Sequence, residues 1–199
     1  MLIIGVTGNI GSGKTTVSKI LEEQGAYVIN ADKIARGVLA KDGAGYGETV
    51  AYFGEGIVGR DGEIDRRALA AIVFSDPGKL DVLNAFTHKH VKSRINEEIA
   101  AVRQNNAHDI ICLDVPLLFE SGLNNICDAA WVVDAGTEIK LARVMERDKT
   151  DRSSAELRLA RQPTREELRQ KGDIIIENNG DYDRLKMQVL LELFKLALP

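Results

Sequence analysis

Short apolar segments alternate along the chain with longer segments in which apolar residues recur every three or four positions. The short segments have the length of strands, and they cover residues 2–6, 27–29, 110–115, 129–133 and 174–176. Alternation of this kind is typical of a parallel sheet with helices on both faces. We therefore predict an α/β fold with a parallel sheet of about five strands.

Helical spacing is clearest in the first and last of the longer segments. The first helix is predicted to begin at Lys14 and to end near Gln24, where Gly25 provides a C-terminal stop. The last helix is predicted to follow Asp181. Its apolar positions form one stripe suited to packing against a sheet, namely Leu185, Val189, Leu190, Leu193 and Leu196.

Two long segments do not fit a simple alternation of strands and helices. About eighty residues separate the second and third predicted strands, far more than a crossover connection needs. We interpret residues 36–107 as an inserted helical lobe that binds substrate, with a turn at residues 60–62 and helix from about Arg66 to Gln104. A polar, arginine-rich segment at residues 139–171 is predicted to be a helical lid.

Length and composition favour one globular domain and exclude several classes of protein. The 199 residues are 44% hydrophobic and 28% charged, which allows a real core. The sheet core is predicted from residues 1–35, 108–138 and 172–199. The net charge of −4 argues against a protein that coats nucleic acid or an acidic membrane surface.

Targeting and cysteine signals are also weak. No apolar stretch is long enough to span a membrane. Cys112 and Cys127 are too few for a disulfide framework, so reduced thiols and a cytoplasmic location are expected. No heptad pattern predicts an oligomeric state.

The strongest chemical signal is residues 8–15, GNIGSGKT, which match the P-loop pattern G-x-x-x-x-G-K-[ST]. The motif lies between a predicted strand and a predicted helix, so the helix N-terminus adds partial positive charge to an anion site. Lys14 is predicted to contact the β- and γ-phosphates of a nucleoside triphosphate, and the Thr15 hydroxyl to ligate Mg²⁺. The predicted nucleotide contacts are Asn9, Ile10, Gly11, Ser12, Gly13, Lys14, Thr15 and Thr16.

Two carboxylates follow predicted strands, at the sheet edge where ligand sites of α/β proteins lie. Asp32 is suited to accept a proton from an acceptor hydroxyl, or alternatively to cap a helix that begins at Lys33. Asp114 follows four apolar residues, as the metal-side aspartate of P-loop proteins does. Its alternative role is to cap the end of the strand.

The arginines of residues 139–171 also allow two interpretations. They can form a solvated helix face, because several glutamates accompany them. They can instead close over the transferring phosphoryl group, whose equatorial oxygens need cations in the transition state. We favour the lid.

Several further segments, taken in order with the P-loop, make the chain similar to the dephospho-coenzyme A kinase family. The matching segments are 4–15, 30–36, 65–74, 114–120, 143–162 and 173–180. This resemblance implies phosphorylation of the ribose 3′-hydroxyl of dephospho-coenzyme A by ATP and Mg²⁺. It implies that Asp32 is the base or orienting group, that Arg147 lies near the phosphates, and that Asn178 and Asn179 lie beside the adenine.

The sequence departs from the family pattern at three positions. Asn30 replaces an expected Asp, Lys89 follows His88 where Pro is expected, and Thr16 follows the P-loop threonine. Without the resemblance, another P-loop kinase for a small alcohol or a nucleoside monophosphate remains the closest alternative. A nucleotide-dependent switch is a second alternative, although the chain lacks the N-K-x-D guanine motif.

Overall fold

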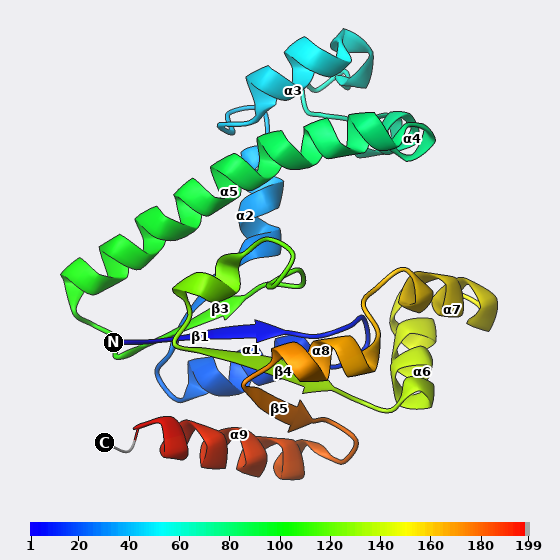
Figure 1. Ribbon diagram of the computed structural model, residues 1–199. Coiled ribbons are helices and arrows are strands. Elements are labelled where there is room, and N and C mark those ends of the chain that lie inside the picture. The colour runs from blue at the N-terminus through cyan, green and yellow to red at the C-terminus, as the bar shows by residue number, and fades with distance from the viewer. Residues whose placement is uncertain (198–199) are drawn as a thin grey trace. The chain divides into compact units, whose positions relative to one another are not determined.

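The computed structural model describes residues 1–197, and its centre is a five-stranded sheet (Figure 1). The strands are β1 (Leu2–Thr7), β2 (Tyr27–Asn30), β3 (Ile110–Asp114), β4 (Ala129–Asp134) and β5 (Ile174–Glu177), in the order β2-β3-β1-β4-β5. The pairings of β1 with β3, of β1 with β4 and of β4 with β5 are parallel. The predicted parallel sheet is confirmed, and every strand ends within one residue of its predicted bounds.

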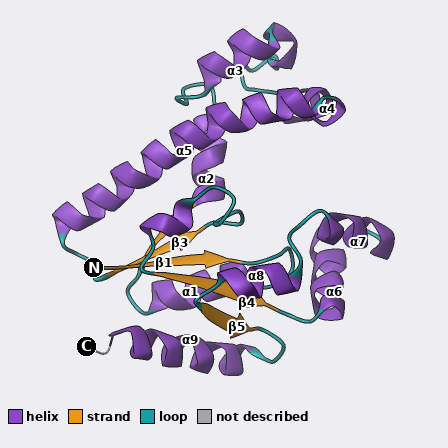
Figure 2. Cartoon of the chain, in the orientation of Figure 1, coloured by secondary structure: helices purple, strands orange, loops and turns teal. Residues whose placement is uncertain are grey.

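Helices and short 3₁₀ turns make up the rest of the regular structure (Figure 2). They are α1 (Lys14–Glu23), α2 (Ala31–Val38), α3 (Tyr46–Phe53), η1 (Glu55–Ile57), α4 (Arg66–Ser75), α5 (Pro77–Asn105), η2 (Leu123–Ile126), α6 (Thr137–Asp148), α7 (Arg152–Ala160), α8 (Arg165–Lys171) and α9 (Tyr182–Ala197). The predicted first and last helices are confirmed. Within residues 1–197 no helix has the length and apolar character needed to cross a membrane.

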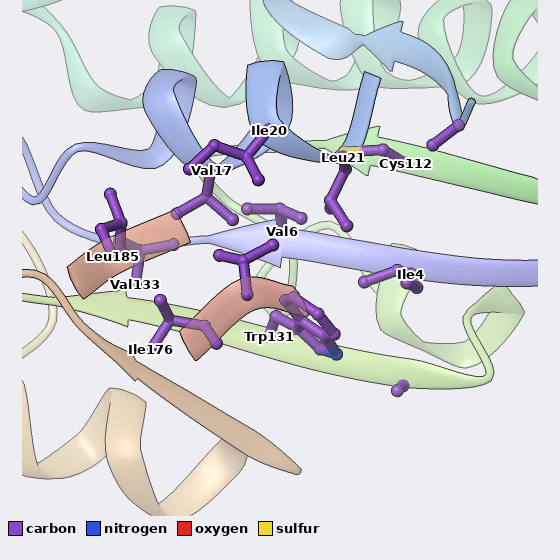
Figure 3. Close-up of a cluster of buried hydrophobic side chains, with 13 residues drawn as sticks. Ile4, Val6, Val17, Ile20, Leu21, Cys112, Trp131, Val133, Ile176 and Leu185 are labelled. Carbon is purple, nitrogen blue, oxygen red and sulfur yellow. The ribbon is translucent and has the colours of Figure 1, made fainter. Parts of the chain in front are cut away.

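The main core lies between the sheet and helices α1 and α9 (Figure 3). Trp131 and Val133 of β4 belong to this cluster and are buried. Successive strand residues point to opposite faces, and Val132 accordingly lies beside Gly172, which directly follows α8. A Cβ atom on Gly172 would be only 2.6 Å from Val132 Cγ2. Helices therefore cover both faces of the sheet, as predicted.

Residues 30–101 form a compact unit of their own, and residues 1–29 with the chain from Val102 onward form the other. The smaller unit has a separate apolar cluster, whose buried members are Ile57, Ile64, Leu69 and Val73. It begins and ends about six residues earlier than the predicted lobe at 36–107. The predicted lid segment falls on most of α6 and on α7 and α8, inside the larger unit.

The lobe contains one helix break that the sequence interpretation missed. Helix was predicted without interruption from about Arg66 to Gln104, but α4 ends at Ser75 and α5 begins at Pro77. Asp76 between them is extended, and its carboxylate accepts a hydrogen bond from the Gly78 amide at 3.0 Å. Proline favours the first turn of a helix and disfavours helical conformation in the residue before it, which accounts for the break.

Candidate active site

The P-loop connects β1 to α1, and its bends depend on glycine. Gly11 and Gly13 have φ values of 77° and 93°, in the left-handed region. Space is equally restrictive: a Cβ on Gly13 would lie 2.0 Å from Asn178 Nδ2, and one on Gly11 would lie 2.5 Å from the Lys140 carbonyl oxygen. Gly13 also offers no side chain to cap α1. The first N–H groups of that helix, which lack acceptors within it, therefore face the loop.

The outer side of the loop is held by side chains from distant parts of the chain. Asn178, after β5, is buried and donates from Nδ2 to the Ser12 carbonyl at 2.7 Å. Arg143 of α6 donates to the Gly11 carbonyl at 3.2 Å and to the Asn178 carbonyl at 3.2 Å. The amide of Asn178 thus supports the loop, and its predicted place beside adenine stays a prediction.

The first residues of the loop contact the connection between α7 and α8. The Asn9 side chain donates to the Pro163 carbonyl at 3.0 Å, and the Ile10 amide donates to Gln162 Oε1 at 2.8 Å. Ser12 Oγ is buried and has no hydrogen-bond partner among the described residues. Gln162 and Arg143 belong to segments that carry the family resemblance, but nothing in the sequence indicates that they contact the loop.

Lys14 and Asp114 meet at the carboxyl edge of the sheet, where β1 and β3 are neighbours. The Lys14 ammonium forms an ion pair with the Asp114 carboxylate, which is 2% exposed. Thr15 and Thr16 follow in the first turn of α1, and Thr15 is exposed. The structure therefore pairs Lys14 with Asp114 and places Thr15 directly after Lys14, while their binding of phosphate and Mg²⁺ stays a prediction.

Asp32 is the second residue of α2 and does not cap that helix. The cap is Asn30, whose side-chain oxygen accepts from the Lys33 amide at 2.9 Å, and the helix begins at Ala31. The alternative interpretation of Asp32 as the N-cap is therefore wrong. Its carboxylate is exposed, and within the described residues it makes no hydrogen bond or ion pair.

The arginines near the end of α6 and in α7 form ion pairs at the surface. Both Arg147 and Arg158 donate to Asp148, Arg147 through two nitrogens at 2.7 and 2.9 Å. These two guanidinium groups hold the pKa of Asp148 well below its usual value. Arg152 binds Glu138 and Glu156 in the same manner. In Figure 1, α6 and α7 lie at the sheet edge toward which β1 and β4 point.

A second group of charges, which the sequence interpretation missed, fixes α8 to the sheet. Asp134 at the end of β4 is buried and accepts hydrogen bonds from Arg165 and Arg169. Arg169 also binds Glu177 of β5. Lys140 is buried nearby, with Nζ 3.9 Å from Asp134, and burial lowers its pKa. The arginines of the predicted lid therefore differ in their partners: Arg147, Arg152 and Arg158 form surface pairs, Arg143 holds the P-loop, and Arg165 and Arg169 are fixed by Asp134.

Neither the cysteines nor a cluster of metal-binding side chains offers other chemistry. Burial raises the pKa of both Cys112 and Cys127 to about 12, so the thiols stay protonated at neutral pH. Both are free cysteines. Among the described residues there is no group of three or more His, Cys, Asp or Glu side chains that could hold a metal ion.

Comparison with known proteins gives matches over nearly the whole length of this chain. A family model described as dephospho-CoA kinase matches residues 2–184. A dephospho-CoA kinase of Moorella thermoacetica is 38% identical over 189 residues, covering 95% of this chain and 89% of that protein. A crystal structure from Thermus thermophilus has a TM-score of 0.84 at 35% identity, covering 99% of this chain and 98% of that one. Dephospho-CoA kinase from Campylobacter jejuni has a TM-score of 0.73 at 29% identity, covering 98% and 96%.

Proposed function

The chain belongs to the dephospho-CoA kinase family, and from its activity as a dephospho-CoA kinase of coenzyme A biosynthesis we propose how its residues divide the work. The reaction moves the γ-phosphoryl group of ATP to the ribose 3′-hydroxyl of dephospho-CoA and yields ADP and coenzyme A. The proposal is supported by two features of the P-loop: Asn178 and Arg143 hold it from outside, and Lys14 forms an ion pair with the buried Asp114. We place the reaction in the cytoplasm.

The P-loop binds the triphosphate of ATP. Backbone amides of Gly11, Gly13 and Thr15 and the N-terminus of α1 surround the phosphate oxygens. Lys14 already lies at the sheet edge, and it contacts the β- and γ-phosphates when ATP binds. Because the loop is held from outside by fixed hydrogen bonds, little reorganisation is needed on binding.

The donor atoms near Lys14 fit a magnesium ion that is bound mainly through phosphate. The Thr15 hydroxyl and the Asp114 carboxylate are hard oxygen donors, and Mg²⁺ in nucleotide sites takes only one or two protein ligands. A magnesium ion held by Thr15 and Asp114 would neutralise negative charge on the β- and γ-phosphate oxygens.

Asp32 orients the acceptor hydroxyl and accepts its proton as the new O–P bond forms. Its carboxylate is exposed two residues after the end of β2, and Asn30 already caps the helix. No structural hydrogen bond therefore competes with a substrate hydroxyl among the described residues. Phosphoryl-transfer transition states are loose, so orientation contributes as much as basicity.

Arg147 stabilises charge on the transferring phosphoryl group. It is exposed, and its present partner Asp148 is a surface carboxylate. Exchange of such a pair for a phosphate oxygen requires little free energy, because exposed ion pairs contribute little to stability. The second partner of Asp148, Arg158, remains to hold the carboxylate.

The lobe has a pocket suited to part of the acceptor. It measures about 590 Å³ and lies wholly within residues 30–101. Its lining combines the apolar side chains of Ile34 and Val38 with charged groups of both signs: the cations Lys33 and Arg94, and the carboxylates Asp42, Glu97 and Glu98. We assign the phosphate-bearing and apolar parts of dephospho-CoA to this lining.

The experiment that tests the proposed function measures ADP release with three parallel mixtures of ATP and Mg²⁺. One contains dephospho-CoA, one contains nucleoside monophosphates, and one contains no acceptor. We expect rapid ADP release with dephospho-CoA alone, and coenzyme A as the product. Faster turnover with a nucleoside monophosphate, or equal turnover without acceptor, would contradict the proposal.

A further inference from the structure

The start of the P-loop is joined to the α7–α8 connection by two hydrogen bonds and to helices α6 and α7 by an apolar contact. The Ile10 amide donates to Gln162 Oε1 at 2.8 Å, and the Asn9 side chain donates to the Pro163 carbonyl at 3.0 Å. The Ile10 side chain also packs on the apolar cluster of α6 and α7, whose buried members are Leu141, Val144 and Ala155. Two consecutive loop residues are thus held by backbone, side chain and apolar surface.

The bond from Gln162 determines how one peptide group of the loop is oriented. The peptide between Asn9 and Ile10 is planar, so its carbonyl and its N–H point in opposite directions. The carbonyl of Asn9 accepts from the Ser12 amide at 3.0 Å and so closes the loop turn. The N–H of Ile10 donates to Gln162. The Gln162 oxygen, which binds the N–H side of this peptide, therefore helps to hold the turn that the Asn9 carbonyl closes on the opposite side.

The same turn is also held at the carbonyl of Ser12. The carbonyl of Ser12 accepts from Asn178 at 2.7 Å and, more weakly, from Arg143. The chain of hydrogen bonds consequently runs from Gln162 through the Asn9–Ile10 peptide and Ser12 to Asn178. Only its Gln162 end comes from the connection between α7 and α8.

Gln162 is itself well supported. Its own amide donates to the Leu159 carbonyl at the end of α7. Pro163 follows it and restricts its backbone. Beyond that, Arg165 and Arg169 attach α8 to the buried Asp134. A side chain on this connection can therefore keep a fixed distance from the loop.

We propose that Gln162 is a positioning residue for ATP binding, which acts by holding the Asn9–Ile10 peptide and thereby the closed turn of the P-loop. This inference rests on the proposed function, because it assumes that the loop binds ATP. Gln162 touches no phosphate. It acts through Ile10, whose N–H is donated to the side chain rather than to the nucleotide.

The test replaces the oxygen of Gln162 and follows the loop directly. Gln162→Met keeps the length of the side chain but removes the acceptor, whereas Gln162→Glu keeps an acceptor oxygen. Gln170→Met is the matched control, because Gln170 is an exposed residue of α8. Amide hydrogen exchange at Ile10, calorimetric ATP binding, and KM and kcat are measured for each variant together with its melting temperature.

A neutral hydrogen bond changes an equilibrium constant by about two- to tenfold, and this sets the expected effects. In Gln162→Met the Ile10 amide should exchange about two- to tenfold faster. The Kd and KM for ATP should rise by a similar factor, with kcat and the KM for dephospho-CoA nearly unchanged, because the loop is equally loosened in ground and transition states. In Gln162→Glu the protection of the Ile10 amide should return. Should the Met variant not fold, Gln162→Asn, one carbon shorter, serves the same comparison.

The proposal is overturned if Gln162→Met matches Gln170→Met in ATP binding and in Ile10 exchange. It is also overturned if only the melting temperature falls, since a merely structural residue would do that. Hydrogen exchange and ATP binding need no acceptor. If the wild-type protein phosphorylated no dephospho-CoA, the proposed function would fail while these two measurements still decided the role of Gln162.

Discussion

The residues assigned to phosphate binding and those assigned to the transfer step differ in how firmly the protein holds them. Around the P-loop, Lys14 is paired with a buried aspartate, and Asn178 is 6% exposed and hydrogen-bonded to the loop. Asp32 and Arg147 lie near the ends of helices, at the surface. Arg147 has one exposed carboxylate as partner, and Asp32 has none within the described residues.

This difference separates groups that must be in place before ATP arrives from groups that must change partners during the reaction. A preorganised phosphate site gains from rigid, desolvated donors, because they need no reorganisation in the transition state. A base and a lid arginine must instead release water or a surface partner and meet the substrate. The arginines of α8 are also firmly held, because the buried Asp134 fixes them.

The largest effect should come from the fixed region. Lys14→Met removes the cation from the phosphates, and loss of one such stabilising group typically costs at least about 10²–10³-fold in kcat. The control is Lys19→Met on the exposed side of the same helix. Rate assays and circular dichroism should show an inactive but folded Lys14 variant and an active Lys19 variant. Near-normal turnover in Lys14→Met would refute the P-loop assignment.

Asp32→Asn should also reduce kcat strongly, by about 10²–10⁴-fold, the usual contribution of a general base. ATP binding depends on the P-loop and should survive, as measured by calorimetry. The melting temperature should not change, because Asn30 caps α2. Asp81→Asn, at an exposed position of α5, is the matched control. The catalytic role is excluded if both variants turn over at the wild-type rate.

A smaller effect is expected from Arg147, whose partner is exchangeable. Arg147→Ala should lower kcat and kcat/KM together, by about tenfold or more, because its phosphate contact forms mainly in the transition state. Arg152→Ala removes a lid arginine that is paired with Glu138 and Glu156 and should leave both constants within about twofold. If both substitutions have equally small effects, Arg147 is a residue of a solvated helix face and has no role in the transfer step.

The pH dependence of the Arg147 effect follows from its partner. Arg147 and Arg158 lower the pKa of Asp148, so its stabilising charge is complete above the ordinary pKa of an aspartate and is lost only as the pH falls through the lowered value. Asp148 therefore stays ionised throughout neutral and weakly acidic solution. The ratio of wild-type to Arg147→Ala rates should be the same at pH 6 and pH 8. A ratio that changes between these values would show that another titrating group controls the arginine.

Local patterns were enough to predict the strands, the P-loop and the first and last helices. The lysine and aspartate of the ion pair could be expected at one sheet edge, because both follow strands of a parallel sheet. The hydrogen bond from Ile10 to Gln162 joins residues 152 positions apart. The pattern of apolar and polar residues along the sequence cannot predict such a long-range contact. The same holds for Asp134 with Arg165 and Arg169. The start of α2 was misplaced because Asn30 and Asp32 both favour helix N-termini, and sequence alone did not decide between them.

The smallest effect is expected at Asn30, the N-cap of α2. Asn30→Ala removes the acceptor of the Lys33 amide, and loss of such a cap costs about 1 kcal/mol of stability. Asn30→Asp should be neutral or slightly stabilising, because aspartate caps equally well and its charge favours the helix N-terminus. The family pattern expects aspartate at position 30, which agrees with a capping role open to either residue. Denaturant unfolding of the two variants beside Asp32→Asn measures this directly: only Asn30→Ala should lower the midpoint. The opposite result, a lower unfolding midpoint in Asp32→Asn and an unchanged midpoint in Asn30→Ala, would show that Asp32 stabilises this helix. Asp32 would then be a structural residue, and its carboxylate would no longer differ from the cap at Asn30.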